Sequence, residues 1–81
     1  MALARVYVTL KKSVFDPQGK TVHAALESLG YHGVSDVRQG KYFEVSLDGM
    51  SPEQARTLAE EIARKVLANP VIEAYRIEVS A

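Results

Sequence analysis

The hexapeptide Arg-Val-Tyr-Val-Thr-Leu, residues 5–10, decides the fold class. Its valines and leucine alternate with arginine, tyrosine and threonine, which is the two-residue period of a strand that buries one face. Similar alternation recurs at residues 42–48 and 71–79, and a short further strand is predicted at residues 34–38. Gln39-Gly40 separates two of these stretches, so the pair predicts a tight hairpin turn in which the glycine takes a positive φ. The sequence therefore predicts four strands.

Two helices are predicted between these strands, each with a start signal and a stop signal. Asp16-Pro17 offers a side-chain cap followed by proline at the first helical position, and Gly30 marks the end of that helix. Ser51-Pro52-Glu53-Gln54 is a capping box, and Asn69-Pro70 ends the second helix because proline disfavours helical backbone in the preceding residue. Each helix has one apolar stripe: Val22, Ala25, Leu26 and Leu29 in the first, and Ala55, Leu58, Ala59, Ile62, Ala63, Val66 and Leu67 in the second.

The resulting order of elements is β-α-β-β-α-β in a chain of 81 residues, which predicts a single domain over residues 1–81. Because each helix and each strand has one apolar side, both helices are expected to cover the same face of the sheet. The predicted fold is an α+β ferredoxin-like sandwich, with a four-stranded antiparallel sheet and two helices on one face.

The composition excludes several classes of function. Ten lysines and arginines balance ten aspartates and glutamates, so no excess positive charge is present to neutralise nucleic-acid phosphates. The absence of cysteine excludes disulfides, thiolate nucleophiles and zinc–thiolate sites. The sequence shows neither a signal peptide nor an apolar run near the roughly 20 residues that cross a bilayer. We therefore expect a cytoplasmic protein that binds neither nucleic acid nor membrane.

The titratable residues do not predict an active site. His23 falls beside the apolar stripe of the first helix and His32 follows that helix, so both are interpreted as surface histidines away from any nucleophile. Glu60 with Arg64, and Glu61 with Lys65, form acid–base pairs four residues apart, which indicates a solvated helix face. We predict no catalytic, cofactor-binding or metal-binding residue in this chain.

Three segments carry a family resemblance. They are Val-Phe-Asp-Pro-Gln-Gly at residues 14–19, Val-Arg-Gln-Gly-Lys-Tyr-Phe-Glu at residues 37–44, and Leu-Ala-Asn-Pro-Val-Ile-Glu at residues 67–73. In this order and spacing they resemble the PurS subunits of phosphoribosylformylglycinamidine (FGAM) synthase. The resemblance covers essentially the whole chain.

The resemblance implies a role in de novo purine (IMP) biosynthesis. FGAM synthase converts formylglycinamide ribonucleotide into its amidine with ATP and the amide nitrogen of glutamine, and it is an ATP- and glutamine-dependent carbon–nitrogen ligase. A large synthetase subunit binds ATP and the ribonucleotide, and a glutaminase subunit releases ammonia. The PurS-like subunit is implied to be non-catalytic, to bridge the other two and to support ammonia transfer. It is further implied to form a dimer or a dimer of dimers and to hold no cofactor, since ATP and magnesium serve the synthetase subunit.

Two surfaces are candidates for protein contact. The first comprises turn and cap residues whose chemistry is more particular than a turn or a helix cap requires. These are Asp16, Pro17, Gln18, Gly19, Arg38, Gly40, Lys41, Asn69 and Pro70. The second is the polar face of the sheet, which combines tyrosines with matched charges and suits a symmetric interface. Its residues are Tyr7, Tyr42, Arg5, Arg76, Glu44 and Glu78.

Three other functions remain open for this predicted fold. A small-molecule regulatory domain of the ACT type has the same architecture and also pairs through its sheets. An RNA-binding RRM places two aromatics on the open face of its third strand, whereas here Tyr42 is followed by Glu44, a carboxylate that would oppose phosphate. Acylphosphatase needs a glycine-rich phosphate loop with an arginine after the first strand, where this chain has residues 13–17 without one.

Overall fold

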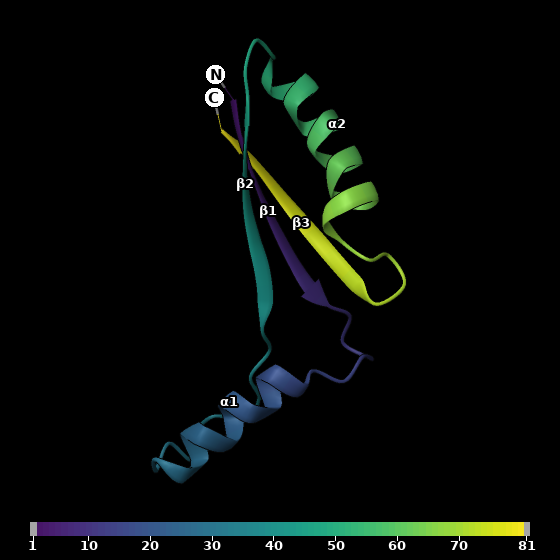
Figure 1. Ribbon diagram of the computed structural model, residues 1–81. Coiled ribbons are helices and arrows are strands. Elements are labelled where there is room, and N and C mark those ends of the chain that lie inside the picture. Colours follow the sequence, from purple (N-terminus) through teal and green to yellow (C-terminus); the bar gives the residue numbers. More distant parts are fainter. Residues whose placement is uncertain (1, 81) are drawn as a thin grey trace.

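The computed structural model describes residues 2–80, and its extents are 49 × 25 × 14 Å. Figure 1 shows the elongated body. Met1 and Ala81, which the predicted domain includes, lie outside the described residues. The elements are β1 (Ala2–Leu10), α1 (Pro17–Ser28), β2 (Gly40–Leu47), α2 (Pro52–Ile62), a π-helical turn (Ala63–Leu67) and β3 (Glu73–Ser80). In Figure 1, α2 runs along the sheet and α1 extends beyond one end of it.

The sheet has three antiparallel strands within residues 2–80, in the order β2-β1-β3. The central strand, β1, pairs along its length with both neighbours, so that Val6 lies opposite Phe43 on one side and Ile77 on the other. Alternate residues of β1 are buried towards α2, among them Val6 and Val8, the largest fully buried side chains of the described core. The hydrophobic core is therefore small and lies between one sheet face and one helix.

α2 packs closely on this face because its inner side is made of small residues. Ala55 and Ala59 are fully buried, and alanine lets a helix backbone approach a sheet. The predicted capping box is confirmed, since Ser51 Oγ accepts a bond from Gln54 N at 3.2 Å and Gln54 Oε1 accepts one from Ser51 N at 3.1 Å. The capping box and the packing on the sheet thus both stabilise this helix.

The predicted strand at residues 34–38 is wrong, because these residues are irregular in the structure. Their backbone groups bind side chains instead of a neighbouring strand. The Val34 carbonyl lies 2.7 Å from His23 Nε2, and Val37 N donates to Asp36 Oδ1 at 2.9 Å. The four-stranded sheet and its hairpin are corrected accordingly to three strands.

Gly40 also differs from the prediction of a tight turn. It begins β2, and the glycines with positive φ among residues 2–80 are Gly30 and Gly49. Gly40 lies beside β1, opposite Thr9, so it belongs to the regular ladder of the sheet.

α1 contradicts the expectation of two helices on one face of the sheet (Figure 1). Its ends follow the sequence signals: Asp16 caps the first turn, and Gly30 follows the helix with a φ of 95°. Its apolar stripe, however, is largely uncovered, with Val22 41% exposed and Leu29 73% exposed. The helix forms where local signals predict it, but contacts at its N-terminal end hold it away from the sheet face.

Candidate functional site

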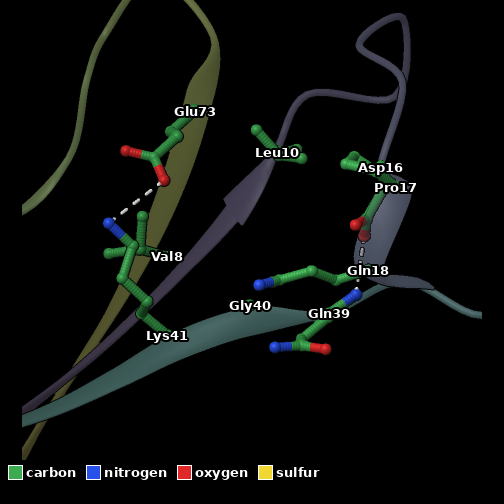
Figure 2. Close-up of a pocket in the computed structure, with 9 residues that line it drawn as sticks. All are labelled: Val8, Leu10, Asp16, Pro17, Gln18, Gln39, Gly40, Lys41 and Glu73. Carbon is green, nitrogen blue, oxygen red and sulfur yellow. Dashed lines mark hydrogen bonds and ion pairs between the residues drawn. The ribbon is translucent and has the colours of Figure 1, made fainter. Parts of the chain in front are cut away.

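A cavity of about 300 Å³ lies where the N-terminus of α1 meets the ends of the strands (Figure 2). We call this region the junction. The residues that line it are Val8, Leu10, Asp16, Pro17, Gln18, Gln39, Gly40, Lys41 and Glu73. They come from β1, α1 and its cap, β2 and the residue before it, and β3. The structure thus brings together Asp16, Pro17, Gln18, Gly40 and Lys41, all of which are candidate contact residues from the sequence.

Asp16 joins α1 to the segment that enters β2. Its side chain is 6% exposed; Oδ1 accepts a bond from Gly19 N at 2.9 Å and Oδ2 accepts one from Gln39 N at 2.8 Å. These bonds favour the ionised carboxyl group and hold the pKa of Asp16 below its usual range, the bond from Gln39 being the largest cause. Both carboxylate oxygens of Asp16 therefore already have hydrogen-bond partners within the chain.

Arg38 fastens the loop between β1 and α1. Its Nη2 donates to the carbonyl oxygens of Lys11 and Val14 at 2.9 and 3.1 Å and lies 3.5 Å from that of Leu10. Carbonyls in an irregular loop need partners of this kind because they have no ladder of their own. Arg38 and Asp16 thus have structural tasks, and whether either also contacts a partner subunit stays a prediction.

Gly19 and Gly40 permit the close approach of the chain segments at the junction. A Cβ atom on Gly19 would clash with the Val37 carbonyl oxygen and lie 2.9 Å from Asp16 Oδ2. A Cβ atom on Gly40 would lie 2.7 Å from Thr9 Cγ2. Both positions need glycine for space.

Lys41 and Glu73 close one side of the cavity, as Figure 2 shows, with 3.4 Å between Lys41 Nζ and Glu73 Oε2. The other oxygen of Glu73 accepts a bond from Asn69 N at 2.7 Å, and the Asn69 carbonyl accepts one from Glu73 N at 2.7 Å. Asn69 and Pro70 therefore form a turn beside the cavity, linked to it through Glu73, rather than lining it.

Sequence reasoning missed Glu73 as a residue of the junction, whereas Gln39 belongs to the predicted contact segment at residues 38–41. Glu73 lies inside the segment at 67–73 that carried the family resemblance, which is the signal that could have found it. The polar ends that remain available at the cavity are those of Gln18, Gln39 and Lys41, which are exposed residues. The junction therefore presents amide and ammonium groups on a fixed support.

The two histidines are nearer to each other than the sequence predicted. The Glu27 carboxylate lies 3.6 Å from His23 Nε2 and 3.3 Å from His32 Nδ1, and His23 also meets the Val34 carbonyl. His23 is thus a partly buried residue that helps to place the segment after α1. Among residues 2–80 no group of three or more histidine, aspartate or glutamate side chains is arranged to hold a metal ion. No helix in that same range is long and apolar enough to span a membrane.

Comparison with known families assigns the chain. The PurS family of phosphoribosylformylglycinamidine (FGAM) synthase matches residues 3–81. The chain belongs to the PurS family. The phosphoribosylformylglycinamidine synthase subunit PurS of Bacillus subtilis (strain 168) is 49% identical over 79 residues, covering 98% of this chain and 93% of that protein.

Solved PurS structures have the same fold. A structure of Bacillus subtilis PurS superposes with a TM-score of 0.88 at 48% identity and covers 100% of both chains. The crystal structure of Methanocaldococcus jannaschii PurS gives a TM-score of 0.89 at 38% identity, covering 99% of this chain and 96% of that chain. That protein is one of the subunits of formylglycinamide ribonucleotide amidotransferase in the purine biosynthetic pathway. The resemblance to PurS is therefore confirmed over the whole described fold.

Proposed function

We propose that this chain is the small non-catalytic subunit of an FGAM synthase and bridges the synthetase and glutaminase subunits during ammonia transfer. The observation that carries the proposal is the family match over residues 3–81. The proposal assigns no cofactor to the chain, because ATP and magnesium act in the synthetase subunit.

The junction is the proposed contact with one of these subunits. Asp16, Arg38 and the close approach at Gly19 hold three chain segments together, so little ordering remains to oppose binding there. Gln18, Gln39 and Lys41 then offer hydrogen-bond donors and acceptors from a fixed frame. A bound partner would also cover the partly exposed side chain of Leu10 in the cavity wall.

α1 is the proposed site of self-association in the dimer. The exposed apolar stripe that includes Val22 and Leu29 needs a cover, and the structure leaves this helix beyond the sheet. A second copy of the chain can supply an apolar surface, since Val66 and Val71 are 75% and 77% exposed. Burial of such side chains is favourable by about 1.5–3 kcal/mol for each one fully covered.

Reconstitution tests the bridging function. The purified chain is mixed with the glutaminase and synthetase subunits in the presence of glutamine and ADP, and co-purification is followed by an assay of glutamine-dependent FGAM formation. We expect one complex and an activity that depends on this chain. If the other two subunits bind each other and form FGAM equally well without it, the proposal fails.

Matched lysine variants locate the contact. Lys41 and Lys65 are 57% and 59% exposed and each pairs with a glutamate, at 3.4 and 2.8 Å, but Lys65 lies in the π-helical turn, away from the junction. Lys41→Ala and Gln18→Ala should weaken complex formation by at least about fivefold, as at an energetically important contact. Lys65→Ala should leave it unchanged. Full activity of both junction variants would instead direct attention to the outer face of α2.

A further inference from the structure

The cavity at the junction has walls that hydrogen bonds hold in place. Asp16 Oδ2 accepts a bond from Gln39 N at 2.8 Å, and Glu73 Oε1 accepts one from Asn69 N at 2.7 Å. The volume of about 300 Å³ is at the lower end of the range for ligand pockets, which is about 300–1,000 Å³. Walls that are fixed before binding lose little entropy when a ligand enters. The cavity can therefore hold a molecule of only a few heavy atoms.

The polar groups of the cavity differ in what they can still bind. Both oxygens of Asp16 accept backbone bonds, and Glu73 accepts one backbone bond and pairs with Lys41 at 3.4 Å. An ammonium group has three N–H donors, so Lys41, which is 57% exposed, keeps donors for a ligand. The carboxamide of Gln18 offers a donor and an acceptor. The cavity thus has a cationic donor and a neutral amide to offer.

These two groups approach the cavity from opposite sides. In Figure 2, Gln18 extends from the start of α1 over Gly40, and Lys41 extends from β2 towards Glu73. Gly40 has no side chain to fill the space between them. Leu10, which is half-buried, and Pro17, which is exposed, add an apolar part to the wall. A ligand that fits therefore needs two different polar groups and a short apolar portion.

The charges of the lining residues limit the charge of the ligand. Asp16 and Glu73 are acidic and Lys41 is basic, which leaves one net negative formal charge. Asp16 is ionised at neutral pH, because the bond from Gln39 lowers the pKa of its carboxyl group. A dianion such as phosphate would be repelled by this excess. A molecule with one carboxylate and one ammonium group adds no net charge and can still pair with Lys41.

We propose that the junction binds a free α-amino acid with a small apolar side chain. The carboxylate of the amino acid pairs with Lys41, and its ammonium group donates to the amide oxygen of Gln18. Its side chain packs against Leu10 and Pro17. This binding site goes beyond the bridging function and does not rest on it, because all of these residues belong to one chain and the isolated protein should bind the ligand.

An NMR titration of the full chain with L-valine tests the proposal. The backbone amide signals of Gln39, Gly40 and Lys41 should shift and saturate with a Kd of roughly 1 mM, as expected for so few contacts. L-Valinamide lacks the carboxylate, and isovalerate lacks the ammonium group. Each should bind at least about tenfold more weakly than L-valine, because each loses a charge-assisted hydrogen bond. Inorganic phosphate should leave the three signals unmoved.

Matched variants assign the binding to the two polar groups. Lys41→Ala and Gln18→Ala should each weaken L-valine binding by at least about fivefold. Lys65→Ala removes a lysine that is 59% exposed and also pairs with a glutamate, but it lies in the π-helical turn away from the cavity. It should leave the affinity unchanged. The dispersion of the amide signals shows whether each variant is folded.

Three results would overturn the inference. They are unmoved junction signals at about 20 mM L-valine, equal affinities for L-valine, L-valinamide and isovalerate, and wild-type affinity in a folded Lys41→Ala variant. Reconstitution of FGAM synthase is measured separately. Failure to bind L-valine together with normal reconstitution rejects only this site, and L-valine binding together with failed reconstitution rejects only the bridging function.

Discussion

α2 and α1 start with similar signals and have opposite surroundings. Each begins with a proline that follows a side-chain cap, Ser51-Pro52 in one case and Asp16-Pro17 in the other. α2 buries Ala55 and Ala59 completely against the sheet, whereas α1 leaves Leu29, at its C-terminal end, 73% exposed. Hydrophobic periodicity therefore identifies the apolar side of a helix without identifying what covers it. In this chain the sheet covers one helix, and the other presents its stripe outward.

The largest expected difference comes from the same truncation in the two helices. Leu58→Ala removes a partly buried side chain that packs on the core and should cost about 2 kcal/mol, at the low end for leucine-to-alanine changes. Leu29→Ala should stay within about 0.5 kcal/mol, as surface changes usually do. Urea unfolding at protein concentrations too low for association measures both. Equal losses would show that α1 is covered within the single chain.

Gly19→Ala should give an effect of unusual sign. In an open helix the change from glycine to alanine stabilises by roughly 1 kcal/mol. Here the added methyl would clash with the Val37 carbonyl oxygen, so we expect destabilisation of about 1–3 kcal/mol.

Gly33→Ala is the matched control for this change, because a Cβ atom at that position has no neighbour within 4 Å among the described residues. It should be neutral or slightly stabilising. Thermal unfolding measures the stability of both variants. A stabilised Gly19→Ala variant would contradict the close contact at the junction.

The smallest expected effect concerns the pH dependence of the junction. The pKa of Asp16 is lower in the folded chain than its ordinary value of 3.8, so the folded state gains stability from this group above that pH. The gain is lost as the pH falls below 3.8 and through the folded pKa. Asp16→Asn should lower the melting temperature at neutral pH and reduce the drop on acidification.

The control for this variant is Asp48→Asn, at an exposed aspartate in the turn after β2. It should keep the wild-type slope of melting temperature against pH. Parallel curves for the wild type and Asp16→Asn would mean that the two hydrogen bonds of the carboxylate add nothing to stability.

Features that depend on neighbouring residues could be predicted from the sequence. The caps at Asp16 and Ser51 are as predicted, since a cap involves residues within one turn. The inward alternation of β3 was also predicted correctly around Ile77, which is 8% exposed.

Features that depend on distant partners could not be predicted. Residues 34–38 contain two β-branched valines, which favour a strand, but their segment is occupied by contacts with the first helix and with the loop before it, including those of Arg38. The placement of α1 likewise depends on contacts at its N-terminal end rather than on its own stripe. At the candidate site, Asp16 was identified early, but its bond to Gln39 joins residues 23 positions apart and has no local signature.

The three carbonyl contacts of Arg38 have a consequence for the order of folding. The loop that they hold precedes Arg38 by 24 to 28 residues, so the loop cannot acquire these partners until the chain has been made past the whole of α1. α1 can become helical as soon as it is synthesised, because helix formation is local. Its direction relative to β1 can be fixed only after Arg38 has been synthesised and has bound the loop carbonyls. During synthesis the helix can therefore form before its direction is set, and Arg38 and Gln39, which follow it in the chain, help to set where its apolar stripe faces.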